Sequence, residues 1–229
     1  MKHKGNARKA AFKIILVSLL AVALIWGIGA IAAFVGTVLA AVAVPFLIVI
    51  WIAFAVFTLY FFRDPNPRVP PGSRLIVSPA HARVDLIDTT TEPSFMEGEC
   101  RRVSMFLSVM DVHVQNAPIT GKVTFVKYTI GQFINAMKAE SAVHNENVLL
   151  GFESSEPEGE KLAVRLIAGL IARRIVPFVK EGDVVNKGER VSLIQFGSRA
   201  DVYLPLSATI KVKIGDKLVG GESVLAEFE

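Results

Sequence analysis

Residues 14–62 read IILVSLLAVALIWGIGAIAAFVGTVLAAVAVPFLIVIWIAFAVFTLYFF, without a single Asp, Glu, Lys, Arg or His. As a helix this stretch would run roughly 70 Å, more than twice the ~30 Å hydrocarbon core of a bilayer. It is also much too long for a secretory signal peptide, whose apolar region spans about 7–15 residues. We therefore predict a membrane-anchoring helical hairpin within residues 1–62, with its turn at Gly36, Thr37 or Pro45.

The charges on either side of this apolar run predict its orientation. Five cations and no acidic residue precede it: Lys2, Lys4, Arg8, Lys9 and Lys13. Arg63 and Arg68 follow it. Cations at both ends favour a hairpin with both flanks in the cytoplasm. The predicted location is the cell (inner) membrane, with the folded domain on the cytoplasmic side.

The overall charge excludes one class of partner. The chain carries 25 Lys and Arg against 21 Asp and Glu, a net charge of +4. Without the five N-terminal cations the net charge becomes −1, so the basic balance belongs to the membrane flank and no nucleic-acid partner is expected. The lone Cys100 cannot form an internal disulfide, which fits a reducing compartment.

The sequence changes character after the apolar run. Residues 63–74 contain four prolines and Gly72, and predict a stiff, non-helical connector. Residues 75–229 show short alternating or β-branched runs, which predict a mostly-β domain. We expect a hairpin turn at residues 154–159 and a short helix at residues 132–138. Strands are expected at Leu75–Val77, Arg83–Ile87, Arg102–Val109, Lys122–Tyr128, Val148–Glu153, Ala163–Ile167 and Ile175–Val179.

An internal repeat lies near the C-terminus. Residues 179–189, VKEGDVVNKGE, recur as residues 212–222, VKIGDKLVGGE. Each copy offers a Gly-Asp turn, apolar positions and a Gly-Glu turn before another strand. Such pairs resemble the half-motifs of biotinyl- and lipoyl-like modules, so we predict a barrel-sandwich hybrid within the β domain. Swinging-arm modules present a lysine between the halves, whereas here Gly197-Ser198 occupies the expected tip.

A Gly-Ser dipeptide is most often a plain turn, but in this setting it can carry chemistry. A serine hydroxyl can attack the carbonyl of the preceding residue if the peptide is bent and strained. Gly197 leaves that carbonyl open to attack. Elimination from the resulting ester, followed by hydrolysis, leaves a pyruvoyl group in place of Ser198. Its carbonyl can accept the electrons released by a decarboxylation.

Four blocks carry a resemblance to a known family. They are YFFRDP at residues 60–65, VSPA at 77–80, FLSVMDVHV at 106–114 and FGSRADVYLP at 196–205. In this order they resemble short-form phosphatidylserine decarboxylase proenzymes, from about Tyr60 to the C-terminus. The resemblance implies self-cleavage between Gly197 and Ser198 and a pyruvoyl cofactor derived from Ser198. It also implies decarboxylation of phosphatidylserine, or archaetidylserine, to the ethanolamine lipid, with a phospholipid and the bilayer as partners; a homo-oligomer is left open.

The same resemblance implies roles for two histidines. His113 falls at the family's histidine in the Asp-Val-His block, which handles protons around the substrate carboxylate and the carbanion. The family's Ser-Pro-Ala-Asp-Gly is replaced here by Ser-Pro-Ala-His81-Ala82. The family's Asp serves as the base of self-cleavage, so His81 stands at that catalytic position. Ala82 is expected to be strained where glycine has a positive φ, and we expect slow or absent self-cleavage.

Other functions are weighed against this one. The alternative is a non-cleaving relative that binds anionic lipid or acts as a membrane scaffold, which the changes at His81 and Ala82 would favour. A membrane-fusion adaptor ranks lower, because adaptors place a long helical hairpin between their half-motifs. A zinc site made of His81, His113 and His144 lacks cysteines and close histidine spacing, so no metal is expected.

Overall fold

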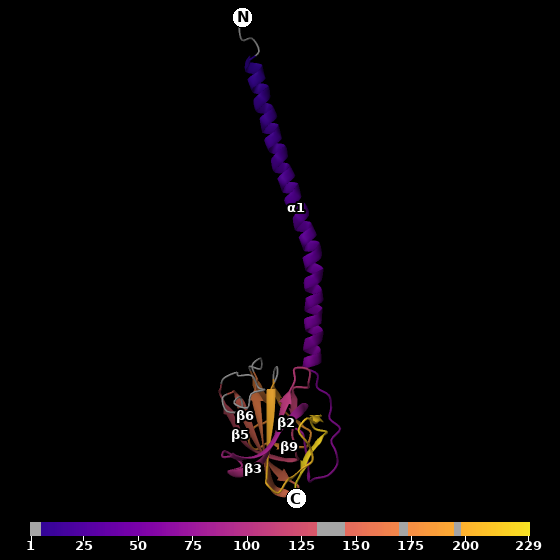
Figure 1. Ribbon diagram of the computed structural model, residues 1–229, viewed down its shortest axis with the longest axis vertical. Helices are drawn as coiled ribbons and strands as arrows, with labels where there is room; N and C mark the ends of the chain where they lie inside the picture. Colours follow the sequence, from indigo (N-terminus) through magenta and orange to yellow (C-terminus); the bar gives the residue numbers. More distant parts are fainter. Residues whose placement is uncertain (1–5, 132–144, 170–173, 195–197) are drawn as a thin grey trace. The chain divides into compact units, whose positions relative to one another are not determined.

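The computed structural model describes residues 6–131, 145–169, 174–194 and 198–229 (Figure 1). The chain divides into two compact units, residues 1–57 and residues 58–229. The predicted helix at 132–138 lies outside the described residues. The elements are α1 (Asn6–Phe61), β1 (Leu75–Val77), β2 (Ala82–Glu92), β3 (Gly98–Leu107), β4 (Val114–Asn116), β5 (Gly121–Thr129), β6 (Asn147–Ser155), β7 (Glu158–Ala168), β8 (Ile175–Pro177), β9 (Val184–Val185), β10 (Arg190–Ile194), β11 (Ser198–Leu204), β12 (Thr209–Ile210), β13 (Lys217–Leu218) and β14 (Val224–Glu227).

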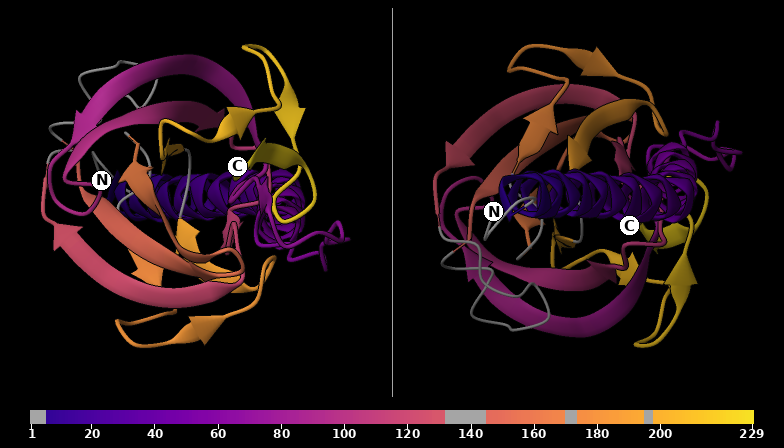
Figure 2. Two further views of the ribbon diagram at one scale, coloured as in Figure 1. Left: turned by 90° about the horizontal axis from the view of Figure 1, so that it is seen from below. Right: turned by 90° about the horizontal axis from the view of Figure 1, so that it is seen from above.

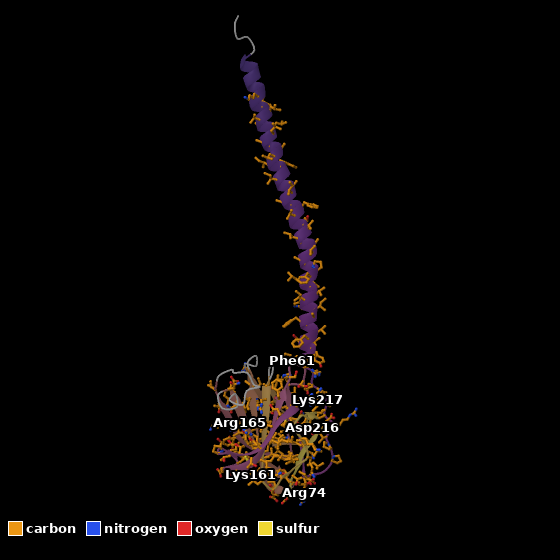
Figure 3. The ribbon with its side chains drawn as sticks, viewed as in Figure 1. Phe61, Arg74, Lys161, Arg165, Asp216 and Lys217 are labelled. Atoms are coloured by element: carbon orange, nitrogen blue, oxygen red, sulfur yellow. The ribbon has the colours of Figure 1, made fainter. Side chains whose placement is uncertain are left out.

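Helix α1 has the composition of a membrane anchor. Its segment Ile15–Phe61 is long and apolar enough to cross a bilayer. Large apolar side chains project from it on both sides in Figure 3, and Trp26, for example, is 79% exposed. Apolar surface of this extent is unfavourable in water at roughly 25 cal/mol per Å² and calls for a lipid environment. The helix is therefore consistent with the predicted membrane anchoring.

The helical hairpin expected from the sequence is not what the structure shows. α1 is one helix of 56 residues that continues through Gly36, Thr37 and Pro45. The hydroxyl of Thr37 donates to the carbonyl of Phe34 at 2.8 Å within the helix. A proline inside a helix removes one backbone hydrogen bond, whereas a turn would leave up to four unpaired groups at each new helix end. Continuing the helix is therefore the smaller local cost.

The second unit is built from three antiparallel sheets. The largest has eight strands in the order β13-β2-β3-β11-β7-β6-β5-β9, and two small sheets have the orders β1-β14-β12 and β4-β10-β8. Figure 2 shows the long strands of the large sheet curling into a half-barrel. Side chains such as Met105, Phe152 and Leu166 are fully buried in one main core. β11 lies in the middle of the large sheet, paired with β3 and β7.

The strand predictions are confirmed where the pattern is periodic. All seven predicted strands are present, as β1 to β3 and β5 to β8; several extend beyond the predicted bounds, whereas β3 and β8 end two residues earlier than predicted. The turn predicted at residues 154–159 joins β6 to β7, with Ser155 opposite Glu158. β11 was not among the predicted strands, because the charged residues Arg199 and Asp201 interrupt its apolar pattern. Ser198 therefore begins a buried central strand instead of forming the tip of a hairpin.

The two copies of the repeat form the same turns. Positive φ angles occur at all four turn glycines: Gly182 (95°), Gly188 (83°), Gly215 (96°) and Gly221 (74°). The carboxylate of Asp183 accepts the N–H of Lys180 at 2.9 Å, and that of Asp216 accepts the N–H of Lys213 at 2.8 Å. Glycine and aspartate therefore do in both copies what the sequence predicted.

Each copy also holds a matching segment elsewhere in the chain. The first copy bonds to residues 117–123, APITGKV, and the second to residues 78–84, SPAHARV. Four backbone hydrogen bonds of 2.8 Å define the match: Gly188 to Ala117, Gly182 to Val123, Gly221 to Ser78 and Gly215 to Val84. The duplication thus extends to the partner segments, where His81 is equivalent to Thr120 and Ala82 to Gly121. Few identical residues remain there, so sequence comparison alone did not reveal it.

Candidate active site

Ser198 occupies an unusual position for a serine. It is the first residue of β11, opposite Leu107 of β3 and Ala168 of β7. It is fully buried, and its hydroxyl has no hydrogen-bond partner among the described residues. A buried hydroxyl without a partner costs about 1–3 kcal/mol. The hydroxyls of Ser104 and Thr124 share this state, so Ser198 becomes a functional candidate through its place directly after Gly197 as well as through its burial.

The backbone brings His113 to the same edge of the sheet. Leu107 faces Ser198, and six residues later the carbonyl of His113 accepts the N–H of Ile194 at 3.0 Å. Residues 108–112 and residues 195–197 therefore connect the same two places: Leu107 lies opposite Ser198, and His113 is bonded to Ile194. Gly197 lies outside the described residues, but Ile194 and Ser198 bound it on either side. The fold thus places Ser198 and His113 in one region.

The ring of His113 is held from two directions. It stacks on Phe61, with ring centroids 4.1 Å apart, and its Nδ1 lies 2.9 Å from the carbonyl oxygen of Asp111. A carbonyl can only accept, so Nδ1 carries the proton and Nε2 is the basic nitrogen. Burial lowers the pKa of His113 to about 4. His113 is therefore neutral at neutral pH.

His81 is bonded differently. Its Nδ1 accepts the N–H of Gly220 at 3.2 Å, so its proton sits on Nε2. At the equivalent position, the hydroxyl of Thr120 accepts the N–H of Lys187 at 3.0 Å. Burial, followed by the charge of Arg63, lowers the pKa of His81. In this structure His81 thus acts as the acceptor of a duplicated turn, and its basic nitrogen is already engaged.

The expected strain at Ala82 is wrong. Ala82 is the buried first residue of β2 and pairs with Leu218. Within the described part of the chain, Glu97 is the one residue other than glycine with a positive φ. Position 82 lies in an extended strand, where alanine fits as readily as glycine. The departure from the family pattern that matters is therefore at His81.

An ion cluster that joins the buried Arg199 and Asp201 to the exposed Asp85 adjoins Ser198, and the sequence did not reveal it. The guanidinium of Arg199 makes two bonds to Asp85, at 2.7 and 2.9 Å, and one to Asp201 at 3.2 Å. Burial raises the pKa of Asp201, while Ser104 and Arg199 act in the opposite direction. Asp85 lies on β2, so the cluster ties the start of β11 to a strand two places away. The sequence signal that could have indicated the cluster is the pair Arg199 and Asp201, two opposite charges beside the apolar residues of β11.

The described residues contain no group of three or more His, Cys, Asp or Glu side chains that could hold a metal ion. His144, named in the zinc alternative, lies outside the described residues.

Comparison with known proteins then places the chain in a family. The family model for phosphatidylserine decarboxylase matches residues 54–226. The chain belongs to the phosphatidylserine decarboxylase family. It is 42% identical over 197 residues to a phosphatidylserine decarboxylase proenzyme of Desulfotalea psychrophila, covering 86% of this chain and 91% of the relative. The proenzyme of Gluconobacter oxydans is 46% identical over 180 residues, covering 77% and 79%. That of Syntrophus aciditrophicus is 42% identical over 191 residues, covering 81% and 89%.

Family membership confirms the predicted enzyme class, a pyruvoyl-dependent decarboxylase made as a proenzyme. The matched span of this decarboxylase includes all four sequence blocks, Ser198 and both histidines. A pyruvoyl group replaces a serine and needs a protected carbonyl. Ser198 fits that need, because its side chain is buried at the start of a central strand and has no hydrogen-bond partner in the part of the chain that the structure describes.

Proposed function

We propose that this proenzyme cleaves itself between Gly197 and Ser198 and then converts phosphatidylserine to phosphatidylethanolamine. The observation that carries the proposal is the buried hydroxyl of Ser198, which has no partner among the described residues. The pyruvoyl carbonyl supplies an electron sink for the loss of carbon dioxide. Archaetidylserine, which carries the same serine headgroup on a different lipid backbone, is the alternative substrate.

The cleavage begins with the hydroxyl of Ser198. Its oxygen attacks the carbonyl carbon of Gly197, and the peptide C–N bond breaks as the nitrogen takes a proton. Elimination from the ester leaves Gly197 as a carboxylate, and water then replaces the nitrogen of residue 198 with a ketone oxygen and releases ammonia. β11 is paired on both sides, so the new chain end stays in register with β3 and β7.

We assign His113 to proton handling at the lipid carboxylate. The bond from Nδ1–H to the carbonyl of Asp111 directs the basic Nε2 away from that carbonyl. A carboxylate brought beside the ring would raise the pKa of His113 from about 4, because an opposite charge stabilises the imidazolium. The protonated ring could then return a proton to the carbon that loses carbon dioxide.

Position 81 gives a direct test of self-cleavage. We expect the wild-type chain to cleave slowly, because Nδ1 of His81 is occupied by the N–H of Gly220. In His81→Asp, one carboxylate oxygen can keep that bond while the other takes the proton of Ser198. Cleavage should then accelerate by about 100-fold, the range of a well-placed general base. Intact mass spectrometry over hours, at several pH values, follows the release of residues 198–229.

The matched control is His81→Asn, which keeps an acceptor for Gly220 but offers no base. It should cleave no faster than the wild type. Rapid and complete cleavage of the wild type would make His81 a working base. Equal rates for the Asp and Asn variants would remove position 81 from the reaction, and intact mass in every variant would favour the non-cleaving, lipid-binding alternative.

The anchor leads to a proposal about the membrane. The apolar segment Ile15–Phe61 has 47 residues, or roughly 70 Å of helix, against a hydrocarbon core of ~30 Å. Membrane helices tilt by at most about 40°, which cannot absorb this excess. We infer that a bilayer divides the segment into two passes near Gly36 or Pro45, with residues 1–13 and the β domain on the cytoplasmic side.

Cysteine labelling tests this arrangement. Gly5→Cys and Asn66→Cys, each in a Cys100→Ala background, should react with a membrane-impermeant maleimide only after the cytoplasmic side is opened. The five cations before the helix and the two after it support this outcome. Labelling of the two positions from opposite sides would show a single pass and rule out the two-pass arrangement.

The predicted barrel-sandwich hybrid also remains a proposal. The duplicated turns at residues 179–189 and 212–222 support it, because both hold an equivalent segment through equivalent backbone bonds. On this reading, Ser198 lies between two related halves of one module, and its cleavage opens the connection between them.

A further inference from the structure

Arg63 is held in one orientation beside the proposed site. Its Nη1 donates to the carbonyl of Tyr60 at 2.8 Å, and its Nη2 donates to the carbonyl of Met110 at 2.7 Å. The guanidinium carbon lies 4.0 Å from the centroid of the Tyr60 ring. The hydroxyl of Tyr60 also donates to the carbonyl of Met110, at 3.3 Å. These contacts fix Arg63 between the last turn of α1 and the loop that leads to His113.

The charge of Arg63 has no anionic partner among the described residues. Other arginines pair with carboxylates: Arg102 with Asp88, Arg165 with Glu92, Arg190 with Asp64, and Arg199 with Asp85 and Asp201. Asp64, which follows Arg63 directly, is taken by Arg190 at 2.6 Å. The bonds of Arg63 go to two carbonyl oxygens, which use two of the five N–H groups of a guanidinium. A half-buried cation in this state is suited to bind an anion.

The surroundings indicate which anion. Phe61, two residues before Arg63, stacks on the buried His113. The charge of Arg63 also lowers the pKa of His113, after the larger effect of burial. Three apolar residues next to Arg63 in the chain or in the loop that it contacts are exposed: Phe62 (40%), Val109 (38%) and Met110 (53%). Arg63 therefore has both an exposed apolar rim, made by these three residues, and a buried histidine among its neighbours.

We propose that Arg63 binds the phosphodiester of the lipid substrate, while Phe62, Val109 and Met110 contact its glycerol and acyl portion. The proposal rests on the site assigned above, because His113 then meets the serine carboxylate at the buried end. The order of groups in phosphatidylserine is acyl chains, phosphodiester, then carboxylate. The apolar rim, Arg63 and His113 offer one matching group for each of these parts, and a guanidinium matches a phosphate with two parallel bonds.

The test separates lipid binding from chemistry with Arg63→Gln and Arg63→Lys. Decarboxylation of phosphatidylserine is measured in mixed detergent micelles, together with inhibition by the product phosphatidylethanolamine, which has the phosphodiester but no carboxylate. Arg63→Gln should raise KM by about 10- to 100-fold, the loss expected for a charge-assisted hydrogen bond. Inhibition by phosphatidylethanolamine should weaken by a similar factor, while kcat changes little. Arg63→Lys should be intermediate, because it keeps the charge but not the planar fork.

Two controls protect this interpretation. Arg68→Gln removes an exposed arginine whose backbone N–H, not its side chain, bonds Glu222, and KM should not change. Release of residues 198–229 needs no lipid, so Arg63→Gln should cleave like the wild type. An unchanged KM, unchanged inhibition by phosphatidylethanolamine, or loss of cleavage in Arg63→Gln would each overturn the proposal. If the cleaved wild type lacked decarboxylase activity, the proposed function would fail, and phosphatidylethanolamine binding alone would still test Arg63.

Discussion

Ser198→Ala should abolish both chain cleavage and decarboxylation, leaving a single uncut chain of 229 residues. The hydroxyl is the attacking group, and the pyruvoyl carbonyl is made from the same residue, so no partial activity is expected. Removing a buried hydroxyl that has no partner among the described residues should leave the free energy of unfolding unchanged or slightly increased. Intact mass, decarboxylase activity and thermal unfolding are measured on the same preparation.

Ser104→Ala is the matched control, since Ser104 is a second fully buried serine, whose hydroxyl acts on the carboxylate of Asp201. It lies on β3, opposite Asp201, and away from the cleavage bond. We expect this variant to cleave and to react with phenylhydrazine, which labels a ketone on the C-terminal fragment. Decarboxylase activity in Ser198→Ala would end the pyruvoyl proposal.

His113→Gln should lower kcat by about 100- to 10,000-fold, the range of general acid–base catalysis, with a much smaller effect on the fold. Glutamine can still donate to the carbonyl of Asp111, but it cannot carry a proton to the substrate. Activity, fragment release and thermal unfolding should be measured together. A variant with normal turnover would show that His113 has only a structural role.

The pH dependence of stability gives a second readout for His113. Its pKa is about 4 in the folded protein and about 6.5 when unfolded, so between these values the unfolded chain binds more protons. Stability should therefore fall as the pH falls through this window. The slope should be shallower in His113→Gln; His81, whose pKa is also lowered, still contributes in both proteins. An identical slope in both proteins would contradict the buried, neutral state of His113.

Elements that depend on local interactions could be predicted from the sequence, whereas elements that depend on contacts between distant residues could not. The apolar anchor was evident because composition alone decides it. Periodic strands such as β2 were also evident, since alternation and turn residues are local signals. β11 was not, because its Arg199 is stabilised by Asp85, 114 residues earlier in the chain. The hairpin turn expected in residues 14–62 is not seen in α1, which continues as one helix, so the two-pass arrangement stays a proposal.

The candidate site shows the same division. Ser198 and His113 could be named from sequence blocks, because the chemistry of a family leaves fixed residue types in fixed order. The positions of Phe61 and Arg63 could not, since each depends on contacts with residues about 50 positions away. The strain expected at Ala82 was wrong because a glycine was taken to indicate a positive φ where the chain is an extended strand.

The central position of β11 has a consequence for the life of the protein after cleavage. Residues 198–229 would become a separate polypeptide that supplies the middle of the eight-stranded sheet and, through β14, a partner for β1. The uncut chain can refold by itself, whereas the mature protein would have to reassemble from two pieces, at a rate that depends on concentration. Before cleavage, the stability of the fold would be set by a reversible folding equilibrium. After cleavage, it would be set by the rate at which the mature protein unfolds. An enzyme that unfolds after cutting would not readily be recovered, and the cell would have to replace it by new synthesis.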